Sequence, residues 1–222
     1  MRMLYHLWLS AGSRKVRIAM GEKNLPFEMK VEKTWERRPE FLDMNPAGDV
    51  PVLVEESGAR IVHAGPICEY LDEAYPERAL ILGDAAERAE VRRLVSWFDD
   101  KFDREVSRAL IEEKMMKRFL GLGTPNSQAI REGMKALHVH LDYVGFLAER
   151  RSWLAGDHLT LADIAAAAHL SALDYTGDVP WEDHPEAKEW YARMKSRPSF
   201  RPILADHIPG APPPKHYADL DF

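Results

Sequence analysis

Two serines near the start of the chain have the best position for chemistry. Ser10 and Ser13 lie in the segment LSAGSRKVRIAM, between an apolar run and a helical pattern. The N-terminal end of a helix favours negative charge, so a hydroxyl placed there can serve a bound anion. It can equally cap the helix by accepting a backbone N–H. We weigh capping and catalysis evenly for Ser10 and favour capping for Ser13, and Tyr5 is a weaker candidate because it lies in mid-strand.

Three cations follow these serines. Arg14, Lys15 and Arg17 lie in the early turns of the same helix, where positive charge opposes the helix dipole. The sequence must compensate for this repulsion in some way. We therefore expect an anion close to these side chains.

Other reactive side chains have simpler explanations. Cys68 shares the inward stripe of a helical segment with apolar residues, which indicates a small core residue and not a nucleophile. Asp99, Asp100 and Asp103 form an acidic cluster on another helical segment. We interpret this cluster as a solvated helix face, with a place in a substrate cleft as the alternative.

The composition excludes several classes of protein. The 222 residues carry a net charge of −6 with both signs mixed, so no basic nucleic-acid-binding surface is expected. No apolar run reaches the roughly 20 residues of a membrane span, and no signal-peptide cleavage pattern follows the first strand. The nine histidines show no HExxH spacing, and there is no CxxC, so no metal site is predicted. A single cysteine excludes an internal disulfide and fits a reducing, cytoplasmic location.

The spacing of apolar residues predicts the strands and helices that must position these side chains, and this spacing changes along the chain. The first part alternates strand and helix patterns, with expected spans at residues 3–9, 13–23, 27–31, 38–44, 50–62 and 65–75. The fifth of these is a hairpin, and every later pattern has helical apolar stripes. We divide the chain into an N-terminal domain at 1–77, a linker at 78–86, a helical domain at 87–206 and a Pro-rich tail at 207–222.

One helix start in the second part has a clear local signal. Thr160 precedes an almost wholly apolar segment, and Asp163 follows three residues later, as in a capping box. We assign both residues to the N-terminus of a buried helix at 160–173, in preference to a role for Asp163 as a catalytic acid.

Four segments resemble the glutathione S-transferase family in this order, from residue 3 to about 206. They are LYHLWLSAGSRKVRIAMGEKNLPFE, NPAGDVPVL, ICEYLDEAYP and LAGDHLTLADIAAAAHL. The resemblance implies an α/β thioredoxin-like N-terminal domain followed by an all-α C-terminal domain. It also implies that Ser10 stabilises the glutathione thiolate, and that the bond between Val50 and Pro51 is cis and presents its backbone to glutathione.

The implied glutathione site departs from the family pattern at one point. Where the family has Glu or Gln followed by Ser, this chain has His63 and Ala64. Ala64 offers no side-chain hydrogen bond to the γ-glutamyl end, and losing such a bond to a charged group costs about 1.5–3 kcal/mol. We expect glutathione binding to be absent or millimolar, and we expect no cofactor to be required.

The tail indicates a narrower resemblance. Together with WERRPEF and RRLVSWFDDKF, the ending PPPKHYADLDF looks like a branch of the family found in alphaproteobacteria, whose members bind the tubulin homologue FtsZ and promote cell division. The resemblance implies a homodimeric interaction module that binds FtsZ filaments at the division site, with little or no glutathione chemistry. The alternative is a glutathione transferase that uses Ser10.

The candidate partner contacts are aromatic and acidic. They are Trp35, Tyr217, Asp219, Asp221 and Phe222. Trp35 stands in a polar loop, and the tail joins a stiff proline stem to an aromatic, acidic end. The alternative is that the tail folds back, with Tyr217 and Phe222 in a groove of its own domain. We expect deletion of residues 215–222 to abolish FtsZ binding with only a slight loss of thermal stability.

Overall fold

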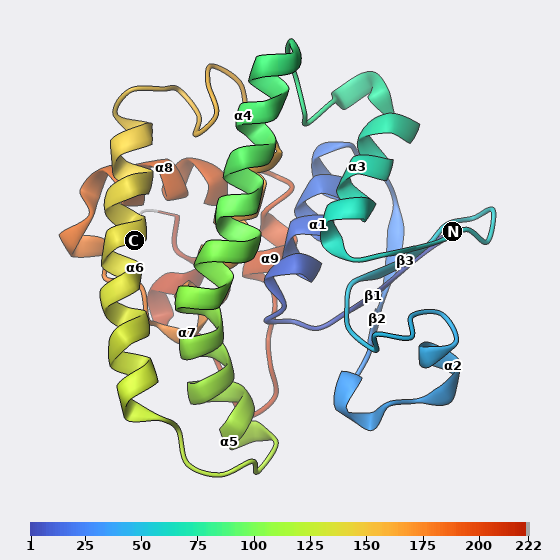
Figure 1. The fold of residues 1–222 in the computed structure, drawn as a ribbon, viewed down its shortest axis with the longest axis horizontal. Coiled ribbons are helices and arrows are strands. Elements are labelled where there is room, and N and C mark those ends of the chain that lie inside the picture. Colours follow the sequence, from blue (N-terminus) through green and yellow to red (C-terminus); the bar gives the residue numbers. More distant parts are fainter. Residues whose placement is uncertain (221–222) are drawn as a thin grey trace.

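A four-stranded mixed sheet forms the centre of the first half of the chain (Figure 1). The structure is a computed structural model and describes residues 1–220. The spatial order is β2-β1-β3-β4, with β1 and β2 parallel and the other neighbours antiparallel. The strands are β1 (Arg2–His6), β2 (Phe27–Val31), β3 (Val52–Val54) and β4 (Arg60–Val62). The apolar run that starts the chain therefore forms an inner strand, as its hydrophobicity predicts.

Helices complete the predicted order of elements in this half. They are α1 (Ala11–Glu22), α2 (Pro39–Leu42) and α3 (Ala64–Ala74), with the 3-10 turns η1 (Thr34–Glu36) and η2 (Pro76–Arg78). The predicted hairpin forms between β3 and β4. Helix α1 packs against α3 and also against α7 of the second half, so it belongs to the boundary between the halves.

Helices make up the second half (Figure 1). They are α4 (Ala85–Ser96), η3 (Trp97–Met116), α5 (Lys117–Phe119), α6 (Ser127–Ala148), α7 (Leu161–Thr176), η4 (Trp181–Asp183), α8 (Pro185–Lys195), α9 (Arg201–Leu204) and η5 (Lys215–Ala218). Within residues 1–220, nothing after β4 joins the sheet. This confirms the predicted fold class. No helix in the described part of the chain combines the length and apolarity that a membrane crossing requires.

The long helix predicted near residues 87–119 forms, but its middle turns are wider than those of an α-helix. Elements α4, η3 and α5 follow one another without a break, and η3 has π-type geometry. Its inward stripe keeps a constant four-residue step through Phe98, Phe102, Val106 and Leu110. Because an α-helical turn has only 3.6 residues, wider turns help to keep such a stripe on one side.

Helix α7 is the buried centre of the second half. All of its residues from Leu161 to Tyr175 are buried, and its capping box forms as predicted. The Thr160 hydroxyl accepts from the Ala162 N–H at 3.3 Å, and the Asp163 carboxylate accepts from the Thr160 N–H at 3.1 Å. Asp163 also accepts from the Trp190 indole at 3.0 Å. Burial raises the pKa of the Asp163 carboxyl, and these hydrogen bonds oppose that rise and give the residue the structural role that was predicted.

Candidate functional site

A cleft of about 890 Å³ opens between the two halves of the chain. The first half contributes Ser10, Val50, Pro51, His63 and Ala64, the predicted glutathione-site residues. The second half contributes Asp99, Ser107, Ile111, Met115 and His169. The start of the tail adds Ile208, Pro209 and Ala211. The tertiary structure therefore gathers all the predicted glutathione-site residues along one wall.

Ser10 lies at the N-terminus of α1 and caps it. Its hydroxyl oxygen accepts from the Ser13 N–H at 3.1 Å, in extended backbone geometry typical of an N-cap. Accepting this bond leaves the hydroxyl hydrogen available to a thiolate in the cleft, so capping does not exclude the catalytic role. The capping role expected of Ser13 is wrong. Its buried hydroxyl instead accepts from the Leu7 N–H at 3.4 Å and so ties α1 to the end of β1.

The wall around Ser10 is tightly packed. The Val50–Pro51 peptide bond is cis, as the family resemblance implied. A side chain at Gly12 would place its Cβ 3.2 Å from the Ala64 Cβ and 3.3 Å from the Pro51 Cδ. Because Gly12 has no side chain, the start of α1 can lie close to Pro51 and to the start of α3. This close packing brings Ser10, Pro51 and Ala64 together on one wall of the cleft.

His63 and Ala64 form the part of this wall that offers the fewest side-chain hydrogen bonds to a ligand. His63 is the N-cap of α3 with a φ of 66° and makes no side-chain capping bond. Its half-exposed ring lies 3.5 Å from Asp49, which is also half exposed. The start of α3 still presents backbone N–H groups, which a carboxylate can bind. Ala64 adds only a methyl group, so this corner lacks the side-chain grip expected for a γ-glutamyl group.

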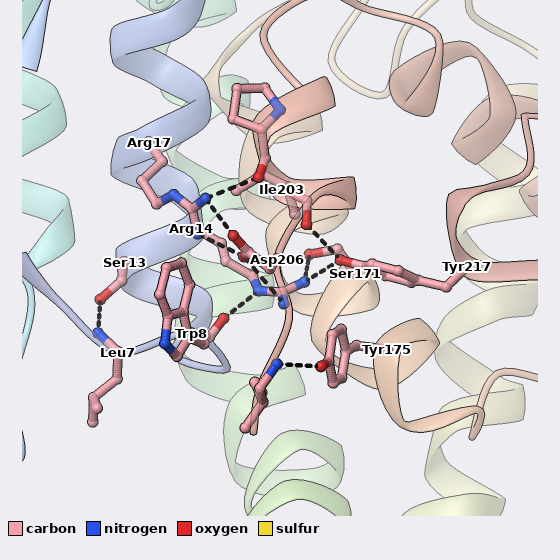
Figure 2. A network of polar contacts seen from close by, with 12 residues as sticks. Leu7, Trp8, Ser13, Arg14, Arg17, Ser171, Tyr175, Ile203, Asp206 and Tyr217 are labelled. Carbon is pink, nitrogen blue, oxygen red and sulfur yellow. Dashed lines mark hydrogen bonds and ion pairs between the residues drawn. The ribbon is translucent and has the colours of Figure 1, made fainter. Parts of the chain in front are cut away.

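The anion expected beside the cations of α1 comes from the protein itself. Arg17 forms a two-pronged ion pair with Asp206, both contacts being 2.7 Å, and Arg14 lies 3.6 Å from the same carboxylate (Figure 2). Lys15 pairs with Asp99 on η3. All three cations are buried. They hold the two halves together and are not arranged to attract an external ligand.

The acidic cluster on η3 does line the cleft, as the alternative interpretation proposed. Asp100 accepts from the Ser96 hydroxyl at 2.6 Å, and Asp103 from Arg108 at 2.9 Å. Asp99 differs from both because it also faces His169, with 3.5 Å between a carboxylate oxygen and Nε2. Burial alone would raise the pKa of Asp99, but contact with His169 and the charge of Lys15 outweigh it and lower that pKa.

Cys68 is a core residue, as predicted. Its side chain is buried on α3, and burial raises the pKa of the thiol to about 12. A thiol with such a pKa holds almost no thiolate near neutral pH, and the thiolate is the nucleophilic form.

The tail folds back onto its own domain. Tyr217 is fully buried, where its hydroxyl accepts from Arg14 at 3.0 Å and donates to the Ile203 carbonyl at 3.0 Å (Figure 2). Tyr175 fastens an earlier part, since its hydroxyl accepts from the Ile208 N–H and donates to the Ala211 carbonyl, both at 2.8 Å. The segment from 207 to 218 is therefore a strap across α1 and α7.

This arrangement corrects one predicted partner contact. Tyr217 is not available to a partner because it serves as the buried anchor of the strap. Deletion of 215–222 would remove that anchor, so we now expect it to cost more stability than the slight loss predicted from the sequence. Asp219 is exposed, whereas Asp221 and Phe222 lie outside the described residues.

Trp35 remains a candidate surface contact. It is 37% exposed and meets Phe119 edge to face, with 5.9 Å between the ring centroids. Phe119 is itself 61% exposed. The pair joins the first half to the second at the mouth of the cleft, so the aromatic residue in a polar loop is explained partly by a contact across the halves.

Sequence reasoning missed Ser107, His169 and Asp206. Ser107 and His169 come together from separate helices, with 3.0 Å between the hydroxyl oxygen and Nδ1. His169 carried a weak signal, because it is a titratable residue that follows a run of apolar residues in a buried helix. Asp206 carried none, since nothing local distinguishes it from a surface acid. Among residues 1–220, no group of three or more His, Cys, Asp or Glu side chains is arranged to hold a metal ion.

Comparisons with known proteins agree on the fold. Residues 4–79 match the family model for the N-terminal domain of glutathione S-transferase, and residues 111–198 match that for its C-terminal domain. FtsZ-localized protein A of Caulobacter vibrioides is 53% identical, over 100% of this chain and 98% of that protein.

Solved structures are similar over the whole chain. A crystal structure of a glutathione S-transferase from Rhodospirillum rubrum has 59% identity and a TM-score of 0.98, with 100% of both chains covered. The structure of FzlA from C. crescentus has 52% identity and a TM-score of 0.97, covering 100% of this chain and 99% of that one.

Proposed function

Because this chain belongs to the glutathione S-transferase family, whose fold serves more than one function, we propose that it is an interaction protein that binds FtsZ filaments and promotes cell division. The observation that carries the proposal is the 53% identity to FtsZ-localized protein A, which extends over the whole chain and includes the tail. Little or no glutathione chemistry is part of this proposal.

The part of the cleft formed by Ser10, His63 and Ala64, called the glutathione corner below, has few side chains that could bind glutathione, and this supports the interaction function. Ala64 provides no hydrogen bond, and His63 is directed to Asp49 at 3.5 Å. The cations of α1 are occupied by internal carboxylates. A charged tripeptide would therefore rely on backbone groups and on Ser10, which favours weak binding.

The proposed contact surface has two parts. One is formed by Asp219 and the 42% exposed Leu220, which follow the Tyr217 anchor, together with Asp221 and Phe222, which lie outside the described residues. The other is Trp35 at the mouth of the cleft. Aromatic anchors supply buried contact area at an interface, and a pre-ordered strap lowers the entropy that is lost on binding. We also propose that the protein acts as a homodimer, and that it does so in the cytoplasm at the division site.

Co-sedimentation with FtsZ filaments tests this function. We expect the full chain to pellet with filaments, and both truncation after Ala218 and Asp219→Lys to weaken binding by tenfold or more. Trp35→Ala should have a similar effect, because aromatic anchors carry much of the binding energy of an interface. The matched control is Asp157→Lys, the same charge reversal at another exposed position.

The outcomes separate the parts of the proposal. If the full chain does not pellet with filaments, the FtsZ function is wrong. If it pellets and every variant binds as well as the control, the function stands but the assigned surface is wrong. Truncation after Ala218 keeps Tyr217, so loss of folding should not obscure the result; circular dichroism checks this.

A glutathione transferase that uses Ser10 is the second candidate. It is favoured by the N-terminal position of Ser10 beside the cis Val50–Pro51 bond, and by the R. rubrum structure named as a transferase. Calorimetry with glutathione distinguishes the two. We expect no binding or millimolar binding, whereas a micromolar Kd with aryl-halide turnover lost in Ser10→Ala would establish the enzyme.

A further inference from the structure

A serine, a histidine and a carboxylate meet on the helical wall of the cleft, opposite the Ser10 corner. The Ser107 hydroxyl lies 3.0 Å from His169 Nδ1. His169 Nε2 lies 3.5 Å from Asp99, whose other carboxylate oxygen pairs with buried Lys15. Ser107, His169 and Asp99 all line the cleft. These three side chains come from two helices, η3 and α7.

The hydrogen-bonding roles in this group follow from its charges. Asp99 is paired with a buried ammonium group, so it is an ionised acceptor. A neutral His169 therefore carries its proton on Nε2, facing Asp99, and leaves Nδ1 as an acceptor. Ser107 must then donate its hydroxyl hydrogen to Nδ1. This is the arrangement of a nucleophile, a base and an orienting carboxylate.

We propose that Ser107, His169 and Asp99 form a second reactive site, which takes the acyl group of an apolar ester or thioester. The surroundings favour that substrate class. Ile111 and Met115 follow Ser107 at four-residue steps on η3 and line the same cleft, and Ala172 lines it one turn after His169. An acyl chain can lie along these apolar side chains while its carbonyl carbon meets the serine.

The chemical steps need no external cofactor. The Ser107 oxygen attacks the carbonyl carbon as its proton passes to His169 Nδ1. The bond from that carbon to the leaving oxygen or sulfur then breaks, and the leaving group receives the proton as an alcohol or thiol. A water molecule attacks the acyl-serine with His169 again as the base, which releases a carboxylic acid and restores Ser107. Asp99 is a positioning residue that holds the ring and stabilises its charged form.

This site differs from the glutathione corner and does not depend on FtsZ binding. A purely structural bond between Ser107 and His169 would satisfy two buried groups. It would not, however, lead to a covalent acyl group on one particular serine. The covalent adduct is therefore the measurement that separates a reactive site from a structural contact.

Incubation of the full chain with p-nitrophenyl hexanoate tests the site. We expect intact-mass spectrometry to show one hexanoyl group, and peptide mapping to locate it on Ser107. Ser107→Ala should abolish the adduct, and His169→Asn should slow its formation roughly a hundredfold, as for loss of a general base. Ser57→Ala, in the exposed β3–β4 turn, is the matched control and should react like the parent protein.

Peptide mapping of the acylated parent protein, which carries no substitution, keeps the test decisive even if a variant misfolds. The proposal is overturned if no acyl group forms and the parent protein releases p-nitrophenolate no faster than Ser107→Ala, or if the acyl group forms only on lysines or the N-terminal amine. It is also overturned if a folded His169→Asn protein acylates Ser107 at the parental rate.

Discussion

The two sides of α1 are built in opposite ways. The side facing the cleft presents Ser10 and Gly12 to a corner with few side-chain hydrogen bonds. The side facing α7 and the strap carries Arg14 and Arg17, which reach Asp206 and the strap's anchor (Figure 2). The same helix therefore borders an open ligand corner and a closed ionic junction.

This difference shows where the charge of α1 is used. Positive charge near a helix N-terminus can serve a bound anion, but here the carboxylates of Asp206 and Asp99 occupy it. Arg14 also donates to the Trp8 carbonyl at 2.6 Å, and so connects the cleft wall to the tail. These contacts hold Asp206, the Tyr217 anchor and η3 against α1.

The largest expected effect is on the ionic junction. Asp206→Ala leaves two buried guanidinium groups without their carboxylate, and breaking a buried pair in this way costs about 3–5 kcal/mol of unfolding free energy. Urea denaturation measures the loss. Glu36→Ala breaks the exposed pair with Lys33 and is the control, with less than about 1 kcal/mol expected. Equal losses in the two variants would show that the buried junction contributes no more stability than an exposed ion pair.

A second test uses the pH dependence of stability. His6 is buried at the end of β1, where burial and the charges of Arg17 and Arg14 lower its pKa from 6.5 to about 4. Below pH 6.5 the unfolded chain binds a proton that the folded chain refuses. His6 therefore destabilises the fold progressively as pH falls from 6.5 to about 4, by about 3 kcal/mol in total.

The variant His6→Phe isolates this contribution. It keeps an aromatic ring beside Trp8, whose ring centroid lies 4.6 Å from that of His6, and removes the titrating group. We expect its unfolding free energy to fall less than that of the parent protein between pH 6.5 and 4. Parallel pH profiles for the two proteins would show that His6 is not kept neutral by its surroundings.

The smallest expected effect concerns the affinity for glutathione on the cleft-facing side of α1. Ala64→Ser restores a hydroxyl at the start of α3, and a hydrogen bond to a charged group contributes about 1.5–3 kcal/mol. Calorimetry should show glutathione affinity rising by roughly tenfold or more. Ala59→Ser, in the exposed hairpin, should change nothing. An unchanged affinity in Ala64→Ser would mean that another feature of the corner limits binding.

Much of the architecture could be predicted from local patterns. The strand and helix order, the switch to helices after the connector and the Thr160–Asp163 capping box all depend on residues a few positions apart. The sequence resemblance also placed Ser10, Pro51 and Ala64 in one site, and they do share the cleft. The prediction for Ser13 was wrong because α1 already begins at Ala11, so Ser13 lies inside the first turn and donates its N–H to the Ser10 cap.

Contacts between distant residues were decided by the tertiary structure alone. Arg17 and Asp206 are 189 positions apart, and Ser107 and His169 are 62 apart. No local period or spacing links such pairs, because their partners are chosen by how α1, α7 and η3 pack. The amino-acid sequence by itself determined which segments become helices and, at Thr160, the residue that caps one of them. Packing decided that the cations of α1 pair with carboxylates of the protein itself, and that Tyr217 is a buried anchor and not a partner contact. It also decided that Ser107 meets His169 on the helical wall of the cleft.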